Sequence, residues 1–400
     1  MKLTMRYITI IFAAAGLAPA QFPAYIGAGG CSSSNCHGAA TEANAIDSRI
    51  KGNEFTTWST QDKHARACQA LMDDRGKRMT AILKIADPVH DKRCAACHVM
   101  GSPEKSLSDG VACEACHGAA EKWLGPHTQK NSHETNIRNN GMTDTKDLTV
   151  RAKTCLKCHL GTGDQMVDHD LIAAGHPDLA FEMDTFTYAQ PAHHRLPAAA
   201  MRVRAWAVGQ TTALAEQMRL LSAHTARNWL EFSDLECYQC HHDLRKDSWR
   251  IARGYGSRRP GSLQVNIAHF EILRDLVSVA APDERNALES GLARLSANVF
   301  DAAGTAQAAR AVEKVADALT ERFQKQDIDA AAVLKAVSAG VDRIAAAGVN
   351  SAEQATMTLD ALGAALGRNP DFTRPLYDYL EHPSVYKPSD FVARYQKAAM

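Results

Sequence analysis

The chain has 400 residues, of which 22% are charged, with 45 basic and 45 acidic side chains. A formal net charge of zero argues against the basic surface that nucleic-acid binding requires. The length allows one large or two modest domains. The composition is unusual in its 11 Cys and 17 His, which points to sites built from these two residue types.

The N-terminus has the organisation of a secretory signal peptide. Lys2 and Arg6 form a short basic region, residues 7–17 are apolar, and Ala18-Pro19-Ala20 offers a small-residue cleavage site before Gln21. This pattern predicts a signal peptide over residues 1–20 and a periplasmic or otherwise exported protein. The apolar segment is too short for a transmembrane helix, so we expect no membrane span after cleavage; an uncleaved N-terminal anchor is the alternative.

The next region, residues 21–262, contains four copies of the motif C-x2-C-H. The two thiols of this motif can form thioether bonds to the vinyl groups of haem, and the adjacent His supplies the proximal iron ligand. Four chance occurrences in one chain are not credible, so we predict covalently attached haem c at each copy. The motifs are CAACH (Cys94, Cys97, His98), CEACH (Cys113, Cys116, His117), CLKCH (Cys155, Cys158, His159) and CYQCH (Cys237, Cys240, His241).

A related motif precedes these four. In CSSSNCH, Cys31 and Cys36 are separated by four residues instead of two, and His37 follows directly. A Ser-rich insert can bulge while Cys36 and His37 keep their relative position, so we predict a fifth haem here. A disulfide or two free thiols is the alternative. The eleventh cysteine, Cys68, is expected to be a buried free thiol.

Paired cysteines also occur in zinc sites, redox-active dithiols and structural disulfides. Cys94, Cys97, Cys113 and Cys116 fit the spacing C-x2-C-x15-C-x2-C of a zinc ribbon. A single C-x2-C pair also fits a redox-active dithiol or a structural disulfide. None of these requires a His after the second Cys of every pair. The short spacing between CAACH and CEACH further predicts that their two haems are neighbours.

Twelve His remain after the five proximal ones. A second imidazole would make each iron six-coordinate and low-spin, whereas a Met ligand would raise its reduction potential. The abundance of His favours the first. His64 and His127 are candidates because each lies near a Trp, and His169 and His176 are candidates that lie seven residues apart. Of the adjacent His193 and His194, one is a candidate, and we select His194. For each of these the alternative is an ordinary surface or hydrogen-bonded His. We expect no ligand role for His90, His133, His224, His242, His269 and His382.

The rest of the chain favours helices. A long helix is predicted from about Ala198 to Glu231, and the Gly-rich stretch 253–261 indicates a boundary. Residues 263–400 lack Cys and place Ala, Leu and Val at helical spacing, with Ala311, Val312, Val315, Ala318 and Leu319 on one face. Gly340, Gly348 and Asn369-Pro370 punctuate later helices. We predict a mainly α fold: a loop-rich multihaem cytochrome c domain with little regular structure over 21–262, and a helical bundle over 263–400.

The haem region resembles exported multihaem cytochromes of the cytochrome c-554-like group. The resemblance is carried, in order, by CSSSNCHG, DKHARA, DGVACEACHG, EKWLGPHT, DHDLIAAGHP and CYQCHHDL. It implies closely spaced haem pairs, mainly bis-His ligation, and distal roles for His64, His127, His169, His176 and one of His193 or His194. The C-x4-C-H start and the fifth haem depart from a plain four-haem pattern, and the C-terminal helices lie outside the shared motifs.

These observations predict an extracytoplasmic electron-transfer protein that moves electrons between a redox protein donor and an acceptor. The alternative is a multihaem oxidoreductase that acts on a small nitrogen or sulfur compound at a five-coordinate haem. The chain has enough His to fill every sixth position and no C-x2-C-K variant. The residues therefore favour a carrier over an enzyme.

Overall fold

The structure is a computed structural model. It describes residues 24–42, 50–100, 109–195, 198–226, 231–241, 245–246, 248–249, 261–297 and 299–400. The predicted signal peptide, with its cleavage site, and the Gly-rich stretch 253–260 lie outside these residues. None of the helices within them is long and apolar enough to cross a membrane.

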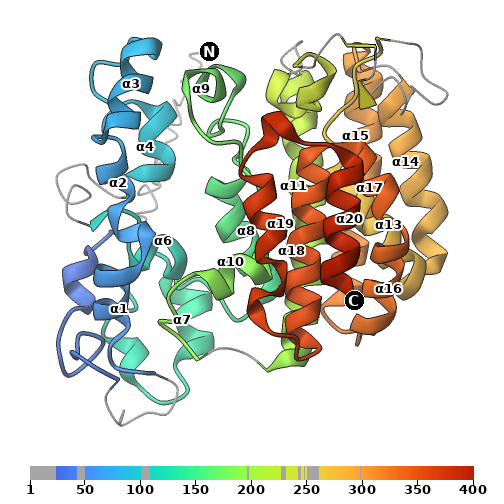
Figure 1. Cartoon of the computed structure of the whole chain (residues 1–400). Helices are drawn as coiled ribbons and strands as arrows, with labels where there is room; N and C mark the ends of the chain where they lie inside the picture. Colours follow the sequence, from blue (N-terminus) through green and yellow to red (C-terminus); the bar gives the residue numbers. More distant parts are fainter. Residues whose placement is uncertain are drawn as a thin grey trace, which may run out of the picture.

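Short helices make up the N-terminal part of the molecule, at the left of Figure 1. Several of those that carry motifs begin at an aspartate whose carboxylate accepts a hydrogen bond from the first turn, which satisfies free N–H groups there. Asp147 caps α8 through Val150 N, at 2.9 Å, and Asp168 caps α9 through Leu171 N, at 2.8 Å. The elements are η1 (Ala28–Cys31), α1 (Glu54–Gln61), η2 (Lys63–Arg66), α2 (Ala67–Ala70), α3 (Asp74–Leu83), α4 (Lys92–His98), α6 (Cys113–His117), η3 (Pro126–Thr128), α7 (His133–Asn140), α8 (Leu148–His159), α9 (His169–Ala174) and α10 (Met183–Ala189).

Longer helices form the rest of the molecule, at the right of Figure 1. The long helix predicted from Ala198 is present as α11, Ala199–Ala226. The elements that follow are η4 (Phe232–Asp234), η5 (Cys237–Gln239), α13 (Ala268–Ala280), η6 (Pro282–Glu284), α14 (Arg285–Ala297), α15 (Ala302–Phe323), α16 (Ala330–Ala339), α17 (Val341–Ala347), α18 (Val349–Ala365), η7 (Pro370–Thr373), α19 (Arg374–Leu380), η8 (Pro383–Val385) and α20 (Pro388–Ala399). The described residues contain isolated β-bridges but no named strand, so the mainly α prediction is confirmed.

The predicted helix ends in the C-terminal part are also confirmed. Gly340 lies between α16 and α17, and Gly348, with φ 133°, lies between α17 and α18. Asn369 caps η7 through Asp371 N. The predicted face of α15 is only partly correct: Val312 and Leu319 are buried, but Ala318 is exposed and Ala316 is buried in its place.

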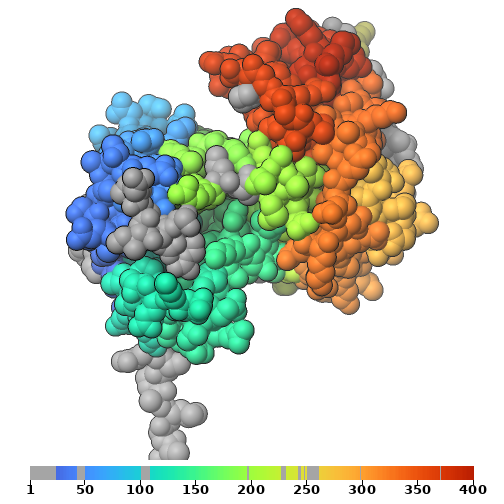
Figure 2. All heavy atoms as spheres, turned by 90° about the horizontal axis from the view of Figure 1, so that it is seen from below, coloured from blue at the N-terminus to red at the C-terminus, as the bar shows by residue number. Residues whose placement is uncertain are grey.

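The main apolar core crosses residue 262. It joins α8 and α10 to the helices from α13 onward, and α11 packs between these two groups. Trp206 of α11 is fully buried, and its Nε1 donates to Thr358 Oγ1 of α18 at 3.2 Å. Among the described residues, the helices near the N-terminus share two small apolar clusters, one around Cys68 and one around Trp58. In the space-filling view the blue and teal part of the chain forms one lobe, and the green segment that follows it lies between this lobe and the orange and red C-terminal helices (Figure 2).

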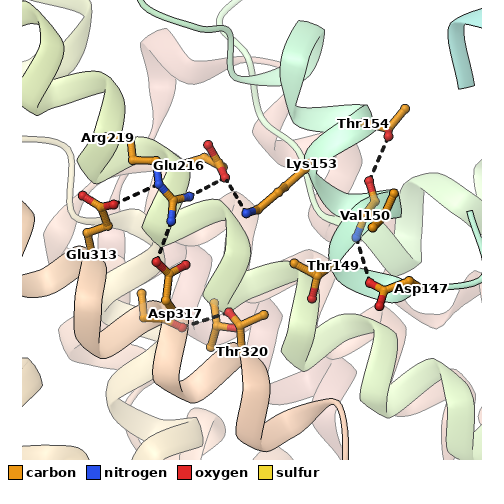
Figure 3. A network of polar contacts seen from close by, with 12 residues as sticks. Asp147, Thr149, Val150, Lys153, Thr154, Glu216, Arg219, Glu313, Asp317 and Thr320 are labelled. Atoms are coloured by element: carbon orange, nitrogen blue, oxygen red, sulfur yellow. Dashed lines mark hydrogen bonds and ion pairs between the residues drawn. The ribbon is translucent and has the colours of Figure 1, made fainter. Parts of the chain in front are cut away.

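A charged network ties one motif-bearing helix to two helices of the main core (Figure 3). Arg219 of α11 contacts Glu216 Oε1 at 2.5 Å, Glu313 Oε1 at 2.9 Å and Asp317 Oδ2 at 2.5 Å. Glu216 also lies 3.6 Å from Lys153 Nζ of α8. The network therefore fixes α8, which ends in the CLKCH motif, against α11 and α15.

Candidate haem sites

Local helical structure puts the reactive groups of each C-x2-C-H motif on one side. CAACH ends α4, CEACH makes up α6, and CLKCH ends α8. Side chains three and four residues apart share one face of a helix, so both cysteines and the following His point in a common direction. CYQCH starts at η5, and CSSSNCH starts at the last residue of η1.

The structure brings four predicted proximal His opposite four predicted distal His. The ring centroids of His37 and His127 are 6.3 Å apart, and those of His98 and His176 are 6.4 Å apart. The other two pairs are His159 with His64, at 6.1 Å, and His241 with His169, at 6.0 Å. His169 and His176 thus face two different motifs, one from the start of α9 and one from just beyond its end.

The separation within these pairs fits two axial imidazoles with one iron between them. A metal–nitrogen bond is about 2 Å long and an imidazole nitrogen lies about 1 Å from the ring centroid, so the two centroids on one iron are about 6 Å apart. All four distances lie close to this value. The residues present therefore fit bis-imidazole haem.

Hydrogen bonds of the rings select the nitrogen that is available for a metal. A ligating His usually donates its other N–H to a carboxylate or carbonyl group, which fixes the tautomer. Nδ1 of His98 and Nδ1 of His176 each lie 2.8 Å from a main-chain oxygen, of Ala67 and Pro177. His127 Nδ1 contacts Leu124 O. In these rings Nε2 is therefore left as the lone-pair donor.

Two of the rings have carboxylate partners instead. His37 Nδ1 lies 3.0 Å from Glu54 Oε2, and His64 Nδ1 lies 3.0 Å from Asp62 Oδ1. The hydrogen bond to Glu54 raises the pKa of His37. The Asp62 side chain is 3% exposed, and Gln190 Nε2 donates to its Oδ2 at 2.7 Å.

Other rings are held neutral, which is the form that binds iron. Burial lowers the pKa of His117 and of His159 to about 4. Apolar rings enclose His159, with Phe181 at 5.0 Å and Phe186 at 5.3 Å between centroids. Burial also lowers the pKa of His176.

The His of CEACH has a different environment. Among the described residues His117 makes no close ring pair. Burial is the largest cause of its lowered pKa, and the next causes are the neighbouring His193, His37 and His194. His194 Nε2 is buried without a hydrogen-bond partner, and burial lowers its pKa to about 4. A buried imidazole nitrogen without a partner is costly unless it binds something, so His194 keeps the character of a ligand, with His193 beside it.

Contacts between cysteines show which motifs are neighbours. The Cys113 thiol is close enough to Cys31 to lower the pKa of Cys31, and Cys158 acts in the same way on the pKa of Cys97. Gln165 Nε2 lies 3.2 Å from Cys97 Sγ and 3.7 Å from Cys158 Sγ, so it bridges the second pair. Both α4 and α6 pack on α8. The CLKCH motif therefore lies beside both CAACH and CEACH, which the sequence spacing did not predict.

Most His without an expected ligand role have other partners. His90 pairs with Asp87, His133 with Asp144, and His269 with Gln210 Oε1 at 2.9 Å. His224 is 5% exposed and its Nδ1 lies 2.6 Å from Asp234 Oδ2, while its Nε2 has no hydrogen-bond partner. Cys68 is fully buried, as expected of a free thiol.

Comparison with known proteins agrees with the motifs. Residues 31–118 match the family described as cytochrome c554 and c-prime. Cytochrome c-554 of Nitrosomonas europaea is 30% identical over 116 residues, which cover 24% of this chain and 48% of that protein. The chain thus spans about half the length of the curated relative it matches, and no solved structure matches it. The resemblance to cytochrome c-554-like proteins is confirmed.

Proposed function

We propose, from the match of residues 31–118 to the cytochrome c554 family, that this chain is an exported multihaem c-type cytochrome that transfers electrons between redox partners. When bound, haem c supplies an iron that accepts and releases one electron at a time. The cysteines of the five motifs would attach it covalently, and the family match supports this for CSSSNCH because the matched segment begins at Cys31.

The four opposed His pairs carry this proposal. Each pair takes one His from a motif and one from a distant segment, at 6.0–6.4 Å between ring centroids. Two strong-field ligands keep the coordination of iron the same in both oxidation states, so little rearranges when one electron is added. For CEACH we assign His194 as the partner of His117.

The spatial order of the motifs supports a conducting row. The mutual effect of Cys31 and Cys113, and of Cys97 and Cys158, on their pKa values supports an order in which CSSSNCH lies beside CEACH and CAACH beside CLKCH. Burial raises the pKa of the Cys155 thiol, and the neighbouring Cys116 thiol adds to this shift, which relates CEACH to CLKCH. The side chains of neighbouring motifs thus lie close enough for their cofactors to be neighbours. CYQCH stands next to CAACH through the segment that bears both His169 and His176.

The rival function, catalysis on a small nitrogen or sulfur compound at an open iron, has one candidate position, at His117. The neighbouring His193 and the unpartnered Nε2 of His194 favour a filled position there. We therefore propose electron transfer as the function, with a redox protein as donor and another as acceptor, in the periplasm or another exported location. Within the chain we propose a cytochrome region over 21–262 and a helical region over 263–400.

Haem count tests this proposal. After export in a host with haem-attachment machinery, intact mass should show five haem additions on a chain starting at Gln21. The double variant Cys31→Ser/Cys36→Ser should carry four, while Cys68→Ser, which changes a buried thiol outside the motifs, should keep five. Four additions on the unaltered chain would remove the CSSSNCH site, and none would refute the proposal.

A further inference from the structure

The hydrogen bonds to the axial imidazoles differ among the motifs in one physical respect, the charge of the acceptor. At CLKCH and CSSSNCH an imidazole Nδ1 faces a carboxylate, of Asp62 and Glu54 respectively, at 3.0 Å. At CAACH both imidazoles face neutral carbonyl oxygens, of Ala67 and Pro177.

Asp62 is built into the fold as a fixed acceptor. Its residue is 2% exposed, and one carboxylate oxygen, Oδ1, accepts from both His64 N and His64 Nδ1 at 3.0 Å. The other oxygen accepts from Gln190 Nε2 at the end of α10. These bonds prevent the carboxylate from turning away from the ring. Because it is removed from water, its charge acts on the ring with little screening.

Glu54 is arranged in the same way at the other motif. Its Oε2 faces His37 Nδ1, and its Oε1 accepts from Lys51 N at 2.5 Å. The side chain is 16% exposed. Each carboxylate thus binds a main-chain N–H as well as the ring, which fixes its direction.

We propose that Asp62 and Glu54 are positioning residues that set reduction potentials, holding the haems of CLKCH and CSSSNCH below that of CAACH. A carboxylate that accepts a hydrogen bond from Nδ1–H gives the imidazole partial anionic character and makes Nε2 a stronger donor to the metal. A stronger donor and a nearby negative charge both stabilise ferric over ferrous iron. The redox step adds one electron to ferric iron, breaks no bond and leaves the proton on Nδ1.

This inference rests on the proposed bis-His ligation and adds a direction to it. Since CLKCH lies beside CAACH, a lower potential at CLKCH favours electron flow from CLKCH to CAACH. The main-chain acceptors at CAACH are neutral and cannot be replaced by side-chain substitution, so the carboxylates are the groups to change.

The test is a redox titration followed by electron paramagnetic resonance on the full-length haem protein. The variant His64→Ala first identifies the CLKCH component, which should change from low-spin to high-spin. Asp62→Asn should then keep that component low-spin and raise its reduction potential by about 59 mV. For a one-electron couple this shift corresponds to a tenfold change in the ferric-to-ferrous ratio at a given potential. Asp147→Asn, which removes a carboxylate at the N-terminus of the same motif helix without touching an imidazole, should leave the potential unchanged.

The outcomes are distinct. An unchanged potential with retained low-spin signal in Asp62→Asn overturns the inference while leaving the ligation intact. A high-spin signal in Asp62→Asn also overturns it, because the carboxylate would then be needed to hold the ligand and not to set the potential. If His64→Ala changes nothing, the proposed ligation itself fails. If Asp62→Asn does not fold, Glu54→Gln applies the same criterion to the CSSSNCH haem, identified by His127→Ala.

Discussion

Replacing Trp206 by Ala tests whether the haem-bearing helices and the C-terminal helices unfold as one unit. The side chain is fully buried in the core that crosses residue 262, and its Nε1 bonds Thr358 Oγ1. Truncating a buried Trp to Ala costs about 3–5 kcal/mol, and the lost hydrogen bond adds about 1 kcal/mol. This is a large part of the 5–15 kcal/mol that stabilises a typical protein.

Two probes distinguish the possibilities in one denaturant titration. Circular dichroism reports the helices, and the Soret band reports the haem environment. Because α8 and α11 share the core with the C-terminal helices, both transitions of Trp206→Ala should shift together to lower denaturant. Ile82→Ala, at an exposed side chain (63%), should change the free energy of unfolding by less than about 0.5 kcal/mol. A shifted helix transition with an unmoved Soret transition would refute this reasoning and support separate domains divided near residue 262.

Two further predictions concern charged groups. Arg219→Met should lower the free energy of unfolding by about 1–2 kcal/mol, because it leaves Glu216, Glu313 and Asp317 facing one another. This loss should shrink in 1 M salt, which screens the repulsion. The control Arg138→Met, which removes an exposed ion pair, should have little effect. Burial, followed by the charge of Asp184, raises the pKa of Glu182 to about 8, so the folded state binds this proton more tightly than the unfolded state. The contribution of Glu182 to the free energy of unfolding should therefore fall as pH rises from about 5 to 8, and equal pH profiles for the unaltered chain and Glu182→Gln would contradict this.

Local sequence predicted the parts of the candidate sites that are close together in the chain. Two cysteines and a His within five residues define each motif regardless of the rest of the fold. The helix ends at Gly340 and Gly348 were likewise predictable, because the residues that end a helix lie next to it. The position of Ala318 was not, since which face of α15 is buried depends on α11 and α14, against which it packs.

Which motifs lie side by side depends on tertiary packing, so local sequence could predict little of it. The short spacing of CAACH and CEACH predicted that their haems are neighbours, and the structure adds that α8, which ends in CLKCH, packs on both motif helices. Which carboxylates accept hydrogen bonds from the imidazole Nδ1 groups was also not predicted from the sequence. Asp62 is two residues from His64 and was open to a local argument, whereas Glu54 reaches His37 only because α1 folds back onto the first motif.

Electron paramagnetic resonance of the oxidised protein tests the central claim, bis-imidazole ligation by the observed His pairs. Imidazole planes that are nearly parallel separate the iron d-orbital energies and give a rhombic low-spin signal, whereas perpendicular planes leave two orbitals nearly equal and give a signal of large g anisotropy. The planes of His37/His127 and His169/His241 meet at 18° and 28°, and those of His64/His159 and His98/His176 at 89° and 88°. From these four pairs we predict two low-spin signals of each class, in addition to the low-spin signal of the CEACH haem. In His176→Ala we predict the loss of one large-anisotropy signal and the appearance of a high-spin signal. A dominant high-spin signal in the unaltered protein, or an unchanged spectrum in His176→Ala, would contradict the account.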